Sequence, residues 1–369
     1  MMVLLHHASE GRHLDALLAN TPAPIKLLVF DGGWVGVPIF FALSGFVIAH
    51  SLAHKIVDGR FLMRFIVRRS LRLDPPYWAS ILLLLAFSWL SARVMHDVWT
   101  FPGWFQLLSH ATYTQLMTGV PQLGGVYWTL TYEIQFYLVL VVSAFVAYRL
   151  APSLGQGVSN AVVSTVLFAI AVAWGTGAIT WLPFHGLFVT LWASFFAGVL
   201  AYRAYTSWKL SAIFLPFVIL MMVAGAPSIR FSALTALVLW AAGISGFLMI
   251  GLRSAWLQWL GAVSYSLYLT HNPVSGAAFF IARRLLPGGA AGEAAQLGLV
   301  IATCLAAATV MRLLVEAPSQ NWAKTFGENR RAPAAGSETG SPLPRRPLPS
   351  VANGALESLR RPGRRPGAP

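Results

Sequence analysis

The chain has 369 residues, of which 57% are hydrophobic and only 10% carry a charge. A water-soluble domain carries about 25% charged residues, so the composition excludes an ordinary soluble globular protein. The net charge of +14 could indicate nucleic-acid binding, but the basic residues lie in short loops and in a C-terminal tail. That placement is typical of membrane proteins, so we expect a lipid bilayer and no nucleic acid as the partner.

Apolar segments of membrane-spanning length recur along the chain, because about 20 apolar residues cross a bilayer as a helix. Open strand edges are not tolerated in lipid, so each segment is predicted to be helical. Nine full spans are predicted, at residues 28–50, 77–93, 127–149, 160–182, 185–203, 209–224, 230–250, 257–281 and 294–315. Residues 1–7 (MMVLLHH) resemble the last turns of a tenth, truncated span. The sequence therefore predicts an all-α integral membrane protein, a bundle of about ten transmembrane helices within a domain over residues 1–325.

The distribution of Lys and Arg predicts the orientation of these spans. The loop after the first full span holds six basic residues, Lys55, Arg60, Arg64, Arg68, Arg69 and Arg72. Loops of this kind stay on the cytoplasmic side. From about Asn329 Pro, Gly, Ala, Ser and Arg dominate, which predicts a disordered, basic, cytoplasmic tail, with the domain boundary placed at residues 326–369. The tail either contacts anionic lipid headgroups or is a solvated extension with no dedicated role.

Small residues mark the first full span. Gly32 and Gly36, and then Ser44 and Gly45, follow one another in a segment that is otherwise apolar and aromatic. Small side chains permit close contact between helices, and they also permit an extended ligand to run beside the backbone. Both interpretations remain open at this point.

Three arginines in the following loop fall on one helical face. Arg64, Arg68 and Arg72 recur every four residues, a spacing that aligns side chains along a helix. Guanidinium groups bind phosphates bidentately, so the face suits a phosphorylated cytosolic donor such as acyl-coenzyme A. The alternative is an ordinary positive-inside anchor. The aromatic-rich loop at 94–126 is expected at the outer interface or along an acceptor groove.

Ionisable side chains inside apolar runs are the strongest functional signal. Glu133 is the one carboxylate in the 127–149 span, and His271 lies in the 257–281 span. With the predicted orientation both fall in the outer half of the membrane, at a depth similar to His6 and His7. Buried charges in a membrane are costly and usually functional, and an imidazole near a carboxylate is a general base. The alternative is that each is a satisfied packing residue.

Other reactive side chains carry less information. Cys304 lies in an apolar run and is expected to be a core residue rather than a nucleophile. His6, His7 and His13 lack nearby Cys or Asp in a regular pattern, so no metal site is predicted.

Four sequence blocks together resemble the acyltransferase-3 family, integral-membrane acyltransferases of bacteria that O-acylate sugars of surface and exported carbohydrates. They are GGWVGVPIFFALSGFVI at 32–48, RFIVRRSLRLDPPYW at 64–78, YWTLTYEIQFYL at 127–138 and WLGAVSYSLYLTHNPV at 259–274, with a weaker VEAPSQ at 315–320. Four blocks in order are specific, and the resemblance covers about residues 1–325.

The resemblance implies roles for individual residues. The family's first-helix histidine corresponds to His6, with His7 as the adjacent candidate, and its acid corresponds to Glu133. The basic residue that the family places eleven positions before this histidine would lie upstream of Met1. Either the start is assigned too late, which is the expected reason, or this chain lacks that residue and half of the helix. The family's loop arginines correspond to Arg68 and Arg72, and its Ser-Tyr-Ser-Leu-Tyr-Leu-Thr-His block to residues 264–271.

The function that follows from this resemblance is transfer of an acyl group, most often acetyl, from acyl-coenzyme A to a carbohydrate or glycolipid hydroxyl at a bacterial inner membrane. The donor's phosphates would bind Arg68, Arg72 and Arg64, and its pantetheine arm would run beside Gly36 and Ser44. His6, oriented by Glu133 or His271, would act as the base, and Tyr132 is a candidate donor to the oxyanion. No permanently bound cofactor is expected. A transporter or flippase for a lipid-linked glycan is the alternative, since it too would use buried charges.

Overall fold

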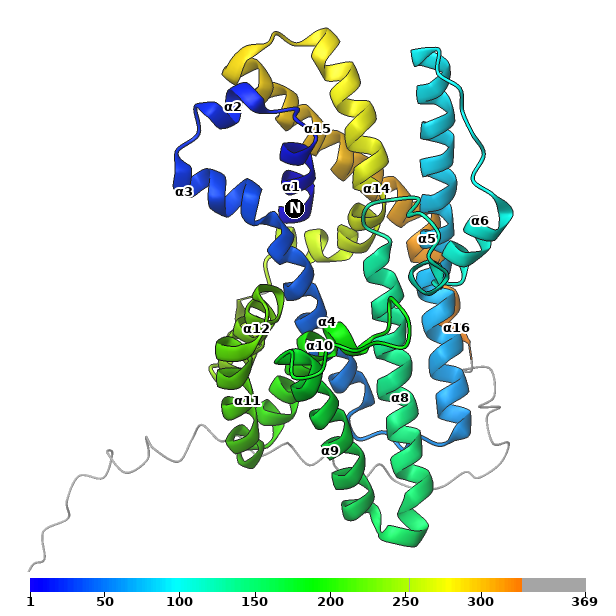
Figure 1. The fold of residues 1–369 in the computed structure, drawn as a ribbon, viewed down its shortest axis with the longest axis vertical. Helices are drawn as coiled ribbons and strands as arrows, with labels where there is room; N and C mark the ends of the chain where they lie inside the picture. The colour runs from blue at the N-terminus through cyan, green and yellow to red at the C-terminus, as the bar shows by residue number, and fades with distance from the viewer. Residues whose placement is uncertain (252, 327–369) are drawn as a thin grey trace, which may run out of the picture. The chain divides into compact units, whose positions relative to one another are not determined.

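The computed structural model describes residues 1–251 and 253–326; most of these residues are helical, and there is no β-strand among them (Figure 1). The predicted all-α fold is therefore confirmed for the described part of the chain. The tail predicted over residues 326–369 lies outside the described residues, apart from Phe326.

Long helices joined by short connections make up most of the fold. They are α4 (Gly36–Leu52), α5 (Gly59–Met95), α8 (Trp128–Leu154), α9 (Gln156–Gly175), α10 (Val189–Thr206), α11 (Ser211–Ala224), α12 (Pro227–Ile244), α14 (Ala255–Leu285) and α15 (Gly289–Met311). The shorter elements are α1 (Met2–Glu10), α2 (Asp15–Ala19), α3 (Ala23–Ile25), η1 (Lys26–Phe30), η2 (Asp31–Val35), α6 (Trp104–Ala111), α7 (Gln115–Thr118), η3 (Trp208–Leu210), α13 (Phe247–Ile250), η4 (Arg312–Glu316) and α16 (Ala317–Thr325). Each predicted span overlaps at least one of the long helices.

Six helical segments are long and apolar enough to cross a membrane, so the protein is a multi-pass membrane protein. They are Ala23–Leu52, Gly59–Met95, Trp128–Leu154, Gln156–Gly175, Pro227–Ile244 and Gly289–Thr325. Helices α10, α11 and α14 are not among the six, although spans were predicted at 185–203, 209–224 and 257–281. Residues 208–224 form only a shorter apolar helix, and α14 carries a run of hydroxyl, amide and imidazole side chains. The count of about ten transmembrane helices stays a prediction.

Three apolar clusters hold the helices together. The largest joins α4, α8, α9, α10, α11 and α12, with Trp192 and Phe195 of α10 fully buried in it. A second joins α1, α2, α14 and α15 around Phe279 and Cys304. The third joins α5, α8 and α14 around Tyr77 and Tyr127. Elements from all three clusters contribute the side chains of the site described below.

The closest helix packing is between α4 and α10, where glycines face each other's backbone. A Cβ at Gly198 would lie 1.8 Å from the carbonyl oxygen of Ala42, and one at Gly45 would lie 2.0 Å from that of Phe195. Real side chains do not approach backbone this closely, so both positions require glycine. Gly45 is therefore a packing residue, as one of the two interpretations of this segment predicted.

Helix α5 continues through two prolines because other elements satisfy the distorted backbone. Pro76 lacks the N–H that would bond the carbonyl of Arg72, and the hydroxyl of Ser319 donates to that carbonyl at 3.5 Å. The Tyr265 hydroxyl donates to the neighbouring Leu73 carbonyl at 2.9 Å. Helix α16 and helix α14 thus dock on the proline pair, which gives the 315–320 block a structural role.

Gly198→Ala should destabilise the protein, because the added methyl meets the backbone of α4. Overpacking of this kind costs about 1–3 kcal/mol or more, which should lower the thermal unfolding midpoint of the detergent-purified protein. Gly298→Ala in α15 is the matched control, since no atom lies within 4 Å of the Cβ position there. Alanine is the better helix former, so the control should be unchanged or slightly more stable. Equal midpoints for both variants would contradict the packing described here.

Candidate active site

The predicted site residues fall into two groups in the structure. The histidine cluster consists of His6 and His7 on α1, Glu10 at the end of the same helix, and His271 on α14. The carboxylate cluster consists of Glu133 and Tyr137 on α8, Ser44 on α4 and Arg69 on α5. Five different helices or loops must meet to form the two clusters.

The ring of His6 is held in one tautomer by the backbone of η1. Its Nδ1–H donates to the carbonyl oxygen of Phe30 at 2.9 Å. A carbonyl only accepts, so the proton is on Nδ1 and Nε2 is the nitrogen that can accept another. Gly33 allows this approach of α1, because a Cβ there would lie 2.6 Å from the Cβ of His6.

Glu10 faces both histidines of α1, as its spacing of four and three residues allows. Its Oε1 lies 3.4 Å from His6 Nε2, and its Oε2 lies 3.1 Å from His7 Nδ1. The side chain of His6 is 19% exposed and that of Glu10 is 58% exposed. A proton arriving at His6 Nε2 would therefore be stabilised by a carboxylate, and the site is open to a molecule from solvent.

His271 extends the histidine cluster into the interior. Its ring stacks on that of His7, with centroids 5.5 Å apart and an angle of 28°. Its Nδ1–H donates to the carbonyls of Leu267 and Tyr268 at 3.1 and 2.9 Å. Its Nε2 is buried and has no hydrogen-bond partner, so one accepting nitrogen remains free beside the two histidines of α1.

The carboxylate of Glu133 lies in the interior and is only 4% exposed. Ser44 donates to its Oε1 at 3.4 Å, and the Ser44 hydroxyl lies 3.1 Å from that of Tyr137. The Arg69 guanidinium covers the Tyr137 ring at 4.3 Å, and Arg69 and Arg72 are the positive charges that act on Glu133. Its Oε2 is buried and has no hydrogen-bond partner, so one carboxylate oxygen of this cluster is not satisfied by the protein.

Tyr268 lies between the two clusters. Its ring centroid is 6.0 Å from that of His271, and the charge of Glu133 acts on its hydroxyl. That hydroxyl is 2.6 Å from Thr129 Oγ1 and donates to the carbonyl of Val126 at 3.1 Å. Among the described residues no hydrogen bond or ion pair joins Glu133 to a histidine, so the predicted contact between them is not made.

The predicted donor-binding arginines have different surroundings. The guanidinium of Arg68 donates to the carbonyls of Phe326 and Lys324 at the end of α16, at 2.9 and 3.5 Å. Arg64 donates only to the carbonyl of Arg60, one turn earlier, at 3.3 Å. Arg72 is exposed. Of the three, Arg64 and Arg72 thus remain available to a phosphate, whereas Arg68 already holds a helix terminus.

Two further predicted residues face protein atoms. The ring of Tyr132 packs against those of Trp128 and Phe136. A Cβ at Gly36 would lie 2.9 Å from a methyl group of Val3, so this glycine allows α1 to approach α4. Their roles toward a ligand stay predictions.

Sequence reasoning missed four polar residues of the two clusters and their surroundings. The spacing of His-His-Ala-Ser-Glu places Glu10 on the same helical side as His6 and His7, which would have indicated it. Glu316 is a single carboxylate after an apolar run, which would have indicated a buried acid. Glu316 is buried and accepts from Ser266 Oγ at 2.5 Å and from the Gln320 amide at 2.8 Å. Arg69 was obscured by the four-residue stripe of arginines beside it. Tyr268 belongs to the 264–271 block that the sequence singled out, but its position between the two clusters was not predicted.

A cleft of about 1090 Å³ opens beside the histidine cluster. It is bounded by the second half of α5, by α14 and by the segment before α8, and it includes Asn272, the neighbour of His271. His13, Arg283 and Arg284 also line it. Burial and the charge of Arg283 lower the pKa of His13. The cleft is mostly apolar, with a cationic end formed by Arg283 and Arg284.

The segment before α8 is held over this cleft by His110 of α6. The imidazole Nδ1–H donates to the Gln106 carbonyl at 3.0 Å, and Nε2 accepts from the backbone N–H of Leu123 at 3.1 Å. Leu123 itself lines the cleft. The neutral form of His110 therefore connects α6 to the wall of the cleft.

A comparison with known proteins indicates the family. A family model described as an acyltransferase domain matches residues 1–312. Over 153 residues the chain is 31% identical to Regulator of hypoxia-inducible factor 1 of Caenorhabditis elegans. The aligned region covers 37% of this chain and 30% of that protein. Over 178 residues it is 25% identical to Peptidoglycan O-acetyltransferase OatA of Listeria monocytogenes, covering 43% of this chain and 28% of that protein. The chain thus spans less than a third of these curated relatives, and no solved structure matches it significantly.

Lowering the pH should loosen the segment over the cleft. Burial lowers the pKa of His110, so the unfolded chain binds the proton more readily than the folded protein. The stabilisation is complete above the ordinary histidine pKa of about 6.5 and is lost as the pH falls below it. Hydrogen exchange of residues 112–126 should therefore accelerate between pH 7.5 and 5, after correction for the intrinsic rate. In His110→Gln, which does not titrate, the acceleration should vanish; its persistence would contradict this role of His110.

Proposed function

The chain belongs to the acyltransferase-3 family, and from this premise we propose that it transfers an acyl group, acetyl being expected, from acyl-coenzyme A to a carbohydrate hydroxyl. The observation that carries the proposal is the geometry of His6, whose Nδ1–H is fixed on Phe30 while Nε2 faces Glu10. A neutral imidazole whose Nδ1–H is fixed leaves Nε2 to accept a proton from a hydroxyl, and a carboxylate beside Nε2 stabilises the imidazolium that results.

The reaction is an acyl transfer without an external oxidant or reductant. The acceptor oxygen attacks the thioester carbonyl carbon while its proton moves to His6 Nε2. The oxyanion collapses, the C–S bond breaks, and the coenzyme A thiolate takes the proton from His6. The products are the O-acyl ester and free coenzyme A. Glu10 would stabilise the imidazolium between the two steps, since opposite charges a few ångströms apart favour the charged form.

The carboxylate cluster would receive the donor's arm. Pantetheine carries amide N–H groups, which need acceptors when they leave water. Glu133 Oε2, which is buried and has no partner, and the hydroxyl of Ser44 are acceptors of this kind. Arg64 and Arg72, at the basic start of α5, would bind the donor's phosphates. Arg68 would support them by fixing α16.

The acceptor would reach the histidine cluster through the cleft between α5 and α14. The cationic end formed by Arg283 and Arg284 suits a glycan with an anionic carrier. A cell-surface or exported carbohydrate at a bacterial inner membrane, with the C-terminus in the cytoplasm, is the setting that we propose. The named activity of the Listeria relative, peptidoglycan O-acetylation, supports a carbohydrate acceptor.

His6→Gln should lower acyl transfer by about 10²–10⁴-fold, the usual cost of removing a general base. The measurement is release of free coenzyme A by the purified protein in lipid nanodiscs, together with alkali-labile acetate on envelope glycans of the producing cells. His96→Asn is the control, since His96 is an exposed residue with φ near 58°, a conformation that Asn tolerates. Near-normal turnover in His6→Gln would exclude His6 as the base. Absence of transfer by the unaltered protein with every donor tested would favour a glycan transporter instead.

Glu133→Gln should weaken binding of the acyl donor more than it lowers the rate of proton transfer by His6. The Gln side chain still accepts from Ser44, but it presents an N–H donor or a neutral oxygen where Oε2 now lies. We expect the KM for acyl-coenzyme A to rise about tenfold or more, which equals a loss of about 1.4 kcal/mol, with the KM for the acceptor unchanged. Glu293→Gln is the matched control, because the Gln oxygen can still accept from the backbone N–H of Leu17. An unchanged donor KM would contradict this role of Glu133.

A further inference from the structure

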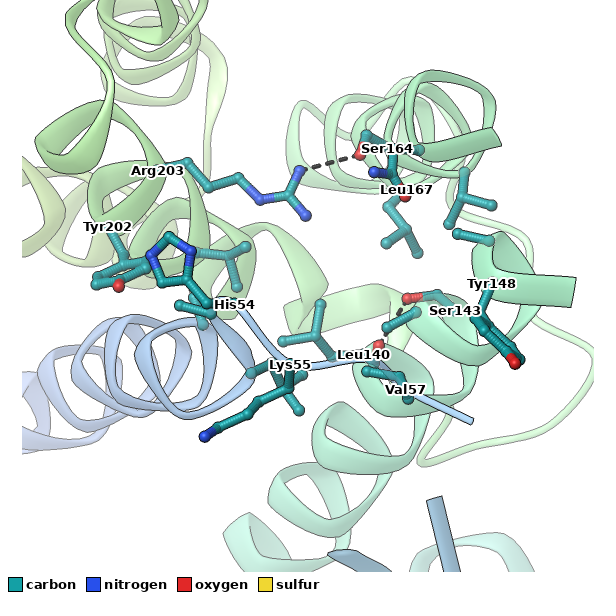
Figure 2. Close-up of a pocket in the computed structure, with 18 of the residues that line it drawn as sticks. His54, Lys55, Val57, Leu140, Ser143, Tyr148, Ser164, Leu167, Tyr202 and Arg203 are labelled. Carbon is teal, nitrogen blue, oxygen red and sulfur yellow. Dashed lines mark hydrogen bonds between the residues drawn. The ribbon is translucent and has the colours of Figure 1, made fainter. Parts of the chain in front are cut away.

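A second cavity lies away from the two clusters and has no part in the mechanism above. It encloses about 630 Å³ between the C-terminal ends of α4, α8 and α10 and the first half of α9 (Figure 2). The segment at 53–57, which connects α4 to α5, forms part of its wall. None of its lining residues belongs to the histidine cluster or to the carboxylate cluster.

The charges of this cavity are all of one sign. Arg203 and Lys55 line it together with His54, and its lining residues include no Asp or Glu. Arg203 extends from α10 toward α9 and donates to Ser164 Oγ at 2.9 Å, as Figure 2 shows. Ser164 is a neutral partner, and in the described part of the chain no carboxylate lies within ion-pair distance of Arg203 or Lys55. The guanidinium thus retains N–H donors for an anion.

The walls below these cations are apolar and neutral polar. Leu140, Leu167 and Val199 form one side, and Ser143 and Asn160 add neutral hydrogen-bonding groups. A free inorganic ion would leave the apolar surface unused. A ligand that carries an anionic group on a longer chain would fill both parts of the cavity.

The cavity continues along the helices that carry the carboxylate cluster. Leu140 is seven residues after Glu133 on α8, which corresponds to about 10 Å along the axis. Ala49, which also lines the cavity, follows Ser44 by five residues on α4. By the predicted orientation, the cavity is therefore on the cytoplasmic side of Glu133, at the level where phosphates of lipids and of soluble nucleotides are both present.

We propose that this cavity binds a phosphate group borne by a chain-like molecule, with Arg203 as the principal contact and Lys55 and His54 at its mouth. Two sources carry this chemistry, an anionic phospholipid and coenzyme A. The second source rests on the proposed function and is compatible with Arg64 and Arg72, because coenzyme A bears a 3′-phosphate separate from its diphosphate. Guanidinium–phosphate contacts are charge-assisted and bidentate.

The test measures binding to the full chain in nanodiscs of phosphatidylcholine, without any acceptor. Coenzyme A and 3′-dephospho-coenzyme A are titrated by calorimetry, and retained phosphatidylglycerol is measured by native mass spectrometry after exchange. Arg203→Gln should weaken one of these ligands at least tenfold. Lys209→Gln is the matched control, because it removes a cation near the same helix end that does not line the cavity.

Ser143→Phe is a second variant that fills the cavity without changing its charge. The Ser143 hydroxyl bonds only to the Leu140 carbonyl of its own helix, so its removal leaves the contacts between helices intact. It should weaken the same ligand as Arg203→Gln, and unfolding midpoints report whether each variant is folded.

Loss of coenzyme A binding in both variants would assign the cavity to the donor, and loss of phosphatidylglycerol alone would assign it to lipid. Unaltered binding of every ligand in folded Arg203→Gln, or no binding to the unaltered protein, would overturn the inference. The proposed function fails separately, if the unaltered protein binds coenzyme A but transfers no acyl group.

Discussion

A carboxylate buried among apolar helices must keep polar neighbours, and this constraint decides which helices of this protein meet. Removing a charge from water costs several kcal/mol unless hydrogen bonds and opposite charges replace the lost solvent. Glu133 on α8 obtains Ser44 from α4 and the charge of Arg69 from α5. Glu316 obtains Ser266 from α14 and Gln320 from α16. The two carboxylates thus connect α4, α5, α8, α14 and α16, the helices on which both clusters of the proposed site depend.

The proline pair of α5 has a related consequence for the basic face. The carbonyl of Arg72 loses its helical partner, and Ser319 replaces it, which brings α16 against α5. The last carbonyls of α16 then meet the guanidinium of Arg68. Neighbouring arginines therefore have different surroundings. Arg68 donates to the end of α16, the charge of Arg69 acts on Glu133, and Arg72 is exposed to solvent. The four-residue spacing predicts that Arg64, Arg68 and Arg72 lie along one side of the helix. It does not predict that neighbouring arginines have different contacts.

The apolar runs predicted the long helices, because burial and membrane insertion depend on composition averaged over about 20 residues. Glu133 stood out as a candidate because it is a single carboxylate within such an apolar run, where a charge is costly. Glu133 and His271 were alternative partners for His6, and no hydrogen bond or ion pair joins Glu133 to a histidine among the described residues. Equal depth fixes a position along the helix axis but not the direction of the side chain around it. Tyr268 occupies the space between Glu133 and His271. Such packing depends on three helices at once, so no single segment carries a signal for it.

The separation of the two clusters has a consequence for how two substrates would meet. His6 and Glu10 are accessible from solvent, whereas Glu133 and His271 are enclosed. A hydrophilic acceptor that stays at the exposed histidines need not lose its hydration in the bundle, which would be expensive for a sugar. A thin, largely apolar arm can enter the bundle at a lower cost, provided that its amides find Ser44 and Glu133. Tyr268 lies at the boundary between the two clusters, with its ring near His271 and its hydroxyl near the charge of Glu133. The acceptor hydroxyl on one side would need to reach only the thioester carbon of the donor on the other side.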